Sequence, residues 1–204
     1  ASVKGVGENA VEAIVSERAA DGPYETIFDF VQRVNLSACN RKNIECLALA
    51  GSFDCFPEIR REQFMQPCGK DETFSDVLVR YGTKYQLDRQ ESRFSLFGDL
   101  GEAIQIATPS IPDAPEWSVL DKLNKEKELI GIYLSAHPLD EYRVILENVC
   151  NVGMVGLEDK SALLNKELIF GGVVVGVRES RVRRNGMPCG FTVIEDFTGS
   201  SEIA

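Results

Sequence analysis

The first residues that could bind a ligand form a short glycine turn. Lys4, Gly5, Val6 and Gly7 precede a run with helical spacing that begins at Glu8. In such a Gly-apolar-Gly turn, backbone amides and the N-terminus of the following helix point outward and can bind a phosphate. Glycine is needed because a side chain blocks the phosphate's approach and resists positive φ. A plain turn between helices has the same pattern, so both interpretations stay open.

A second group of candidate ligand-binding residues lies near the other end of the chain. The stretch 178–187 is rich in arginine and contains an Asn-Gly pair, which is typical of a hairpin turn. Clustered cations of this kind suit contact with nucleic-acid phosphates, and a solvated charged turn is the alternative. The arginines are Arg178, Arg181, Arg183 and Arg184.

Six cysteines and one histidine could suggest a disulfide framework, a metal site or a catalytic centre. No C-x-x-C pair occurs, and His137 is far from the cysteines of the first third of the chain. We therefore expect free thiols that pack as small apolar residues. His137 precedes a proline and has no nucleophile or ligand set near it in the sequence, so we expect a structural role.

Charge and hydropathy limit the possible partners. The net charge of −10 excludes a nucleic-acid-binding surface over the whole molecule but allows local basic patches. No apolar run is long enough for a transmembrane helix, and the first residues lack the pattern of a secretory signal. We expect a cytoplasmic protein with no membrane partner.

Hydrophobic periodicity predicts that most of the chain is helical. Short helices joined by tight turns are expected within 8–19, 24–35 and 40–51. In the first of them Val11, Ile14 and Val15 have the spacing of an apolar face. Asn40 has the residue type of an N-cap for the third. From 58 to 90 the pattern is helical but less regular.

The remainder of the chain changes character twice. Residues 108–117 are too rich in proline for a helix or a central strand and predict a linker. Ser118 then caps a long helix. After about residue 166, runs of valine and isoleucine with internal glycines predict strands. Three strands begin and none closes a fold, so we expect a piece of a larger protein.

Three stretches in order resemble one known family. Residues 3–54, beginning VKGVGENAVEAI, are similar to the tandem helix-hairpin-helix region of the C-family bacterial replicative polymerases, the DNA polymerase III alpha subunits. Residues 126–142, EKELIGIYLSAHPLDEY, resemble the family's segment before its C-terminal domain. Residues 170–204, beginning FGGVVVGVRES, are similar to the first strands of its OB-fold. The fold class expected is mostly α, with a tandem helix-hairpin-helix domain followed by a truncated OB-fold-like β segment.

The resemblance divides the chain into five segments with separate roles. They are a tandem helix-hairpin-helix at 1–57, a helical extension at 58–107, a proline-rich linker at 108–117, a helical connector at 118–165 and the first strands of an incomplete OB-fold at 166–204.

The resemblance also gives roles to the two groups of candidate ligand-binding residues. Lys4, Gly5, Val6 and Gly7 would contact phosphates of double-stranded DNA. A second unit around Asn40, Arg41 and Lys42 lacks a Gly-apolar-Gly turn and is expected to brace the first. In the OB-fold-like segment, the arginine-rich loop with Arg178, Arg181, Arg183 and Arg184 would bind single-stranded template, and Phe191 is a candidate for base stacking or for burial in the barrel.

The resemblance adds a contact with a protein partner at 93–98. In this family an internal peptide of the form Gln-x-x-Leu-Phe binds the beta sliding clamp, and this chain has RFSLFG there. Leu96 and Phe97 match, Phe94 and Ser95 are compatible, and Arg93 replaces the glutamine. An aromatic loop folded back on the helices is the alternative.

The resemblance implies DNA-directed DNA polymerase activity, a nucleotidyl transfer, for the parent protein and none for this segment. Polymerase chemistry needs carboxylates that hold two metal ions, and no such motif is recognisable here. We expect no catalytic residues and no cofactor or metal, with Mg²⁺ confined to the parent's polymerase site. The segment would contribute duplex grip and processivity beside other holoenzyme subunits. Two alternatives stay open, namely a stand-alone helix-hairpin-helix repair or recombination module and a structural interaction scaffold.

Overall fold

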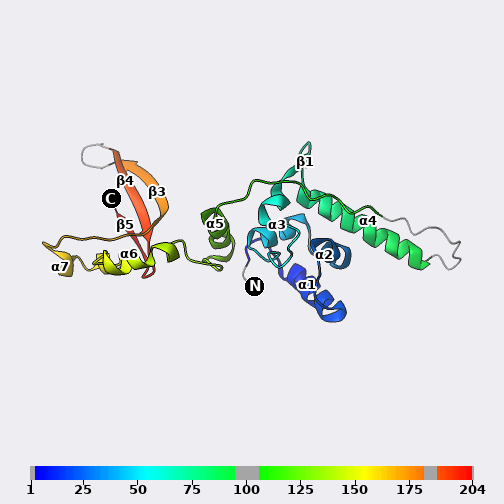
Figure 1. The fold of residues 1–204 in the computed structure, drawn as a ribbon, viewed down its shortest axis with the longest axis horizontal. Helices are drawn as coiled ribbons and strands as arrows, with labels where there is room; N and C mark the ends of the chain where they lie inside the picture. The colour runs from blue at the N-terminus through cyan, green and yellow to red at the C-terminus, as the bar shows by residue number, and fades with distance from the viewer. Residues whose placement is uncertain (1–2, 95–105, 182–187, 204) are drawn as a thin grey trace. The chain divides into compact units, whose positions relative to one another are not determined.

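The chain forms two compact units (Figure 1), which comprise Ala1–Leu134 and Ser135–Ala204. The computed structural model describes residues 3–94, 106–181 and 188–203. The units do not coincide with the five predicted segments. The predicted connector at 118–165 contributes its first helix to the first unit and its remainder to the second.

Three short helices open the first unit, and capping side chains mark where two of them begin. The Oγ1 atom of Thr26 accepts a hydrogen bond from the Asp29 amide at 3.0 Å, which satisfies a free donor of the first turn. Asn40 and Asn43 form a reciprocal capping box, so the predicted N-cap at Asn40 is confirmed. The helices are α1 (Glu8–Asp21), α2 (Ile27–Arg33) and α3 (Arg41–Leu49).

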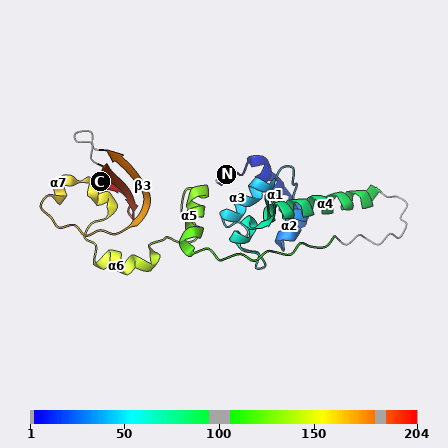
Figure 2. The ribbon, with the colours of Figure 1, turned by 90° about the horizontal axis from the view of Figure 1, so that it is seen from above.

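The less regular stretch after 58 contains a short 3-10 helix and a small antiparallel ladder before a long helix. The ladder pairs residues 67–69 with residues 72–73. The long helix α4 packs along α2 (Figure 2). A further helix follows the linker and is capped, as predicted, by Ser118, whose hydroxyl accepts a hydrogen bond from the Asp121 amide. These elements are η1 (Arg61–Met65), β1 (Pro67–Gly69), β2 (Glu72–Thr73), α4 (Phe74–Phe94) and α5 (Val119–Ile130).

One hydrophobic core joins the helices of the first unit to the loop between α3 and η1. Phe30 of α2 lies edge-on to Tyr24 and to Phe53, with ring centroids 5.0 Å apart in both pairs. Phe64 of η1 stacks on Phe53 at 5.5 Å. The fully buried members include Ala10, Ile27, Val31, Val34, Cys39, Ile44, Phe74 and Leu78.

The apolar face predicted for the first helix is only partly right. Val11 and Val15 are 36% and 47% exposed, whereas Ala10 is fully buried and Ile14 packs against the core. The inner face of a helix is the side that meets its neighbours, and here that side carries a small residue. The larger β-branched residues are left on the outer side.

The proline-rich stretch is fastened to the first unit. Ile106 and Ile111 pack against the core. The Gln63 side chain donates to the Pro112 carbonyl at 2.8 Å, and the Arg60 guanidinium donates to the Ala114 carbonyl at 2.9 Å. The stretch has no helix or strand, as predicted, but it runs along η1 and brings α5 to the same unit.

The second unit is a small antiparallel sheet preceded by short helical turns. The strand order is β3-β4-β5, with a register shift in β3 between Val174 and Gly176. The first strand begins at Val173, later than predicted, but the expected order of a helical region followed by a small β segment is confirmed. The elements are η2 (Asp140–Tyr142), α6 (Arg143–Asn148), η3 (Met154–Glu158), α7 (Lys160–Leu163), β3 (Val173–Arg181), β4 (Pro188–Glu195) and β5 (Ser200–Ile203).

Candidate nucleic-acid interface

The glycine turn predicted from the sequence is present and leads into α1. Gly5 has a φ of +85°, a backbone conformation that favours glycine. The Val6 amide donates to the Val3 carbonyl at 3.2 Å, which closes the turn. The Val6 side chain packs against the hydrophobic core while Lys4 and Gly7 are exposed. The apolar residue thus anchors the turn and leaves its outer side open.

Helix α3, in the predicted second helix-hairpin-helix around 40–42, braces this turn. The Asn43 side-chain amide, which is buried, donates to the Gly5 carbonyl at 2.8 Å. The Sγ atom of Cys46 lies 2.6 Å from the position that a Cβ on Gly5 would occupy. Any larger residue at position 5 therefore meets α3. The sequence predicted a brace around 40–42 but did not identify Asn43 or Cys46. The place of Asn43 at the third position of the capped helix is the signal that could have identified it.

The first turn of α1 has no side-chain cap. Gly7 is its N-cap residue, with φ −77° and ψ 161°, and it makes no side-chain hydrogen bond to the helix. Among the described residues, no hydrogen bond is found for the backbone amides of Gly7, Glu8 and Asn9. In α3, by contrast, the Asn43 amide is already bonded to the Asn40 side chain at 3.2 Å. The open amides and the positive end of the α1 dipole suit an anion.

Two lysines are exposed in this region, Lys4 in the turn and Lys42 in the first turn of α3. Lys42 lies one helical turn before Cys46 on α3, and the Cys46 sulfur lies beside Gly5 of the glycine turn. Burial raises the pKa of the Cys46 thiol, and the charge of Lys42 opposes that increase. Arg41, in contrast, forms ion pairs with Glu45 at 3.4 Å and Asp76 at 3.2 Å. Of Arg41 and Lys42, the cations of the predicted second helix-hairpin-helix, Lys42 is therefore the better placed to attract a phosphate.

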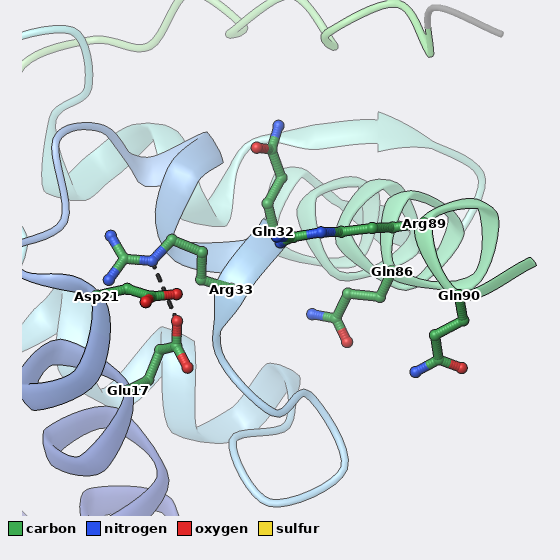
Figure 3. A pocket seen from close by; sticks show the side chains of 7 residues that line it. All are labelled: Glu17, Asp21, Gln32, Arg33, Gln86, Arg89 and Gln90. Atoms are coloured by element: carbon green, nitrogen blue, oxygen red, sulfur yellow. Dashed lines mark hydrogen bonds and ion pairs between the residues drawn. The ribbon is translucent and has the colours of Figure 1, made fainter. Parts of the chain in front are cut away.

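A polar cleft between α1, α2 and α4 is a different kind of site (Figure 3). The Arg33 guanidinium in it donates to Glu17 at 3.2 Å and to Asp29 at 2.9 Å. The Gln86 side chain donates to the carbonyls of Val31 and Val34, at 3.0 and 2.8 Å. These bonds tie the helices together, so we interpret the cleft as structural. Its lining residues are Glu17, Asp21, Gln32, Arg33, Gln86, Arg89 and Gln90.

In the second unit, Arg178 and Phe191 face each other across β3 and β4. The Arg178 guanidinium lies over the Phe191 ring at 4.2 Å and makes two hydrogen bonds of 2.8 Å to Glu202 of β5. The bond to Arg178 lowers the pKa of Glu202, so the pair is ionised at neutral pH. Phe191 is half-buried. A nucleic acid that used these residues would have to compete with Glu202.

The other predicted arginines are described only in part. Arg181 is the last residue of β3, and Arg183 and Arg184 lie outside the described residues. The structure therefore brings Arg178 and Phe191 together and gives no positions for the loop.

The predicted clamp-binding peptide also lies mostly outside the described residues. Ser95, Leu96 and Phe97 are among those not described, whereas Arg93 and Phe94 are the last residues of α4. The first two positions of the predicted peptide are thus helical in the chain alone, and clamp binding at 93–98 stays a prediction. The polar run before them has high helix propensity and continues α4 to its end.

His137 and Cys39 take part in packing, whereas Cys55 and Cys68 are exposed, so the packing predicted for the cysteines is wrong for these two. The His137 ring lies against Phe197 with centroids 4.5 Å apart, and its Nδ1 atom accepts from the Leu139 amide at 3.2 Å. All six cysteines are free thiols, and burial raises the pKa of Cys39 to about 11. Within the described ranges, no three His, Cys, Asp or Glu side chains are grouped so as to hold a metal ion. No helix of these ranges has the length and apolar character to cross a bilayer.

The chain matches known proteins over its helical start and over nearly its full length. Residues 1–63 match a helix-hairpin-helix motif family. A DNA polymerase III subunit alpha of Mycobacterium tuberculosis is 31% identical over 206 residues, which cover 99% of this chain and 17% of that protein. That of Treponema pallidum is 31% identical over 203 residues, covering 98% and 16%.

A third relative, the DNA polymerase III subunit alpha of Chlamydia pneumoniae, is 38% identical over 150 residues, which cover 70% of this chain and 11% of that protein. The chain thus spans about a sixth of the length of the first two relatives. The motif and the matches agree with the resemblance expected from the glycine turn and the segments after it. Along nearly its whole length, this chain is related to one region of the DNA polymerase III alpha subunits.

Proposed function

We propose that the turn Lys4–Gly7 and the first turn of α1 bind a phosphate of double-stranded DNA. The observation that carries this proposal is the uncapped N-terminus of α1 directly behind the turn, with open amides at Gly7, Glu8 and Asn9. Lys4 supplies a cation beside these amides, and α3 keeps the turn rigid through Asn43. Backbone amides and lysine are sufficient for this contact, so the proposed binding needs no cofactor.

The proposed role is grip on DNA during replication rather than chemistry. As part of a longer polymerase, the segment would hold the duplex close to the enzyme beside the other holoenzyme subunits. Several weak contacts on one protein raise the effective concentration of each for its partner, which supports processivity without one tight site.

A salt titration tests the duplex contact. We expect affinity for a short duplex to fall steeply as salt rises, because each neutralised phosphate releases counterions. Lys4→Ala should weaken binding and reduce the slope of log K against log salt by about 0.9. The control is Lys70→Ala, an exposed lysine in the turn between β1 and β2. Fluorescence anisotropy at several salt concentrations measures the affinity and its salt dependence. Absence of binding at low salt contradicts the proposal.

We also propose that the arginine-rich loop after β3 binds single-stranded DNA, with Arg178 and Phe191 at its base. The stack of Arg178 on Phe191 supports the proposal, because an arginine plane and an aromatic ring are both surfaces on which a base can stack. The same titration with a single-stranded oligonucleotide tests it.

The beta sliding clamp is the proposed protein partner of residues 93–98. Leu96 and Phe97 would enter an apolar pocket of the clamp, so replacing both with alanine should abolish capture of the chain on immobilised clamp. Leu87→Ala is a matched control, because Leu87 is 53% exposed on α4, the helix that ends just before this peptide. Equal capture of the double variant and the unmodified chain contradicts this proposal.

A further inference from the structure

Helix α5 is fastened to the first unit by a buried ion pair. Glu126 of α5 is fully buried, and its Oε1 atom lies 2.8 Å from Nη1 of Arg61 in η1. Arg61 is 8% exposed and is held from its other side by Asp54, whose two carboxylate oxygens lie 2.9 and 3.0 Å from Nε. The Oε2 atom of Glu126 accepts from the Leu134 amide at 3.1 Å. Glu126 thus fixes both the helix and the segment that follows it.

Apolar contacts alone hold α5 weakly. Leu123 is its only buried apolar side chain and Leu129 and Ile130 are partly buried, whereas Val119 and Leu120 are 70% and 47% exposed. One leucine stabilises the seating of a helix by about 2 kcal/mol. Removal of one partner of a buried ion pair has a comparable or larger effect, because the other charge is left buried without compensation. The position of α5 therefore depends strongly on Glu126.

The last turn of α5 reaches the glycine turn. The Leu129 carbonyl accepts a hydrogen bond from the Lys4 amide at 2.8 Å, and the helix ends at Gly131 in the left-handed conformation. Consecutive residues of the turn are thus held by two elements, Lys4 by α5 and Gly5 by Asn43 of α3.

We propose that Glu126 is a positioning residue for the phosphate site, since its ion pair with Arg61 seats α5 so that the Leu129 carbonyl fixes Lys4 next to the open end of α1. The functional part of this inference rests on the proposed duplex contact. It makes α5 a component of the DNA-binding unit, whereas the sequence predicted a connector there.

The test compares Glu126→Gln with Glu128→Gln in the full chain. Both variants remove one negative charge from α5, and Glu128 is exposed. Charge alone predicts tighter DNA binding for both. The positioning role predicts that only Glu126→Gln binds a short duplex more weakly, by about tenfold, because its neutral side chain leaves Arg61 without one of its partners. The opposite expected changes in DNA affinity distinguish the positioning role of Glu126 from the effect of removing a charge.

Hydrogen exchange without DNA supplies a readout that does not depend on binding. In Glu126→Gln, the Lys4 amide should exchange at least about tenfold faster, while the amides of α2 stay protected. Leu123→Ala loosens the same helix without stranding a charge and should give the same pattern. If the unmodified chain fails to bind DNA, the proposed function is wrong, but the exchange pattern still decides whether Glu126 positions Lys4.

Three results overturn the inference. One is unchanged exchange at Lys4 in both variants. Another is weaker DNA binding by Glu126→Gln with Lys4 exchange at the unmodified rate. The third is loss of protection throughout α2 in both variants, since α5 would then be part of the core on which the whole unit depends.

Discussion

A Gly7→Asp variant should be more stable than the unmodified chain and should bind duplex DNA at least about tenfold less tightly. The backbone of Gly7 already has the extended conformation of an N-cap, and a Cβ added there meets no atom within 4 Å. The new carboxylate can accept hydrogen bonds from the open amides of α1 and interacts favourably with its dipole, a gain of about 0.5–1 kcal/mol. The same carboxylate occupies the donors that a phosphate would use and repels the phosphate.

Because stability should rise while DNA affinity falls, this variant is a sharp probe of the phosphate site. Thermal unfolding followed by circular dichroism measures the stability, and anisotropy with a labelled duplex measures the binding. Gly7→Ser is the matched control, since its hydroxyl caps the helix without adding a charge and should give an intermediate affinity. If Gly7→Asp binds DNA as tightly as the unmodified chain, phosphate is not bound at this helix end.

Gly5 is a poorer probe than Gly7 for a structural reason. Its φ of +85° is strained for other residues, and its Cβ position lies 2.6 Å from the Cys46 sulfur. Gly5→Ala should therefore disturb the packing of the turn on α3 whether or not DNA binds there. Gly5 is thus needed for its backbone conformation, whereas Gly7 leaves the approach to the α1 amides open.

The features that the sequence predicted correctly depend on neighbours within a few residues. The N-caps at Asn40 and Ser118 bond to amides three residues ahead. The glycine turn is closed by a bond from Val6 to Val3. Helix spacing, cap chemistry and strand composition are local properties, so they can be recognised in one sequence without knowledge of the fold.

The features that the sequence did not predict join distant parts of the chain. Asn43 bonds to Gly5 from 38 residues away. Glu126 pairs with Arg61 from the other side of the proline-rich stretch. Glu202 forms an ion pair with Arg178, one of the arginines assigned to single-stranded DNA. No period or spacing encodes such pairs. They follow from how the helices and strands pack, and they decide which of the candidate residues are open to a ligand.

Phe30→Ala should lower the free energy of unfolding of the first unit by about 3–5 kcal/mol. Phe30 is 2% exposed, and its ring contacts Tyr24 in the loop before α2 and Phe53 in the loop before η1. Helical spacing predicted a helix within 24–35, but it did not identify Phe30 as a core residue. Its aromatic partners lie in two separate loops, and a loop has no period from which its buried residues can be read.

Urea unfolding followed by the fluorescence of the single tryptophan measures this loss in the first unit. Trp117 lies in the stretch that is fastened to η1, with Lys125 of α5 4.6 Å from its ring centre. A loss of this size moves the midpoint down by about 2 M, given the usual dependence of about 2 kcal/mol per molar urea. Phe170→Ala, in the second unit and 37% exposed, is the control and should leave the Trp117 transition unchanged. An unchanged midpoint in Phe30→Ala would mean that the aromatic loop is not part of the cooperative core. The glycine turn, whose Val6 packs against that core, would then owe its position to α3 and α5 alone.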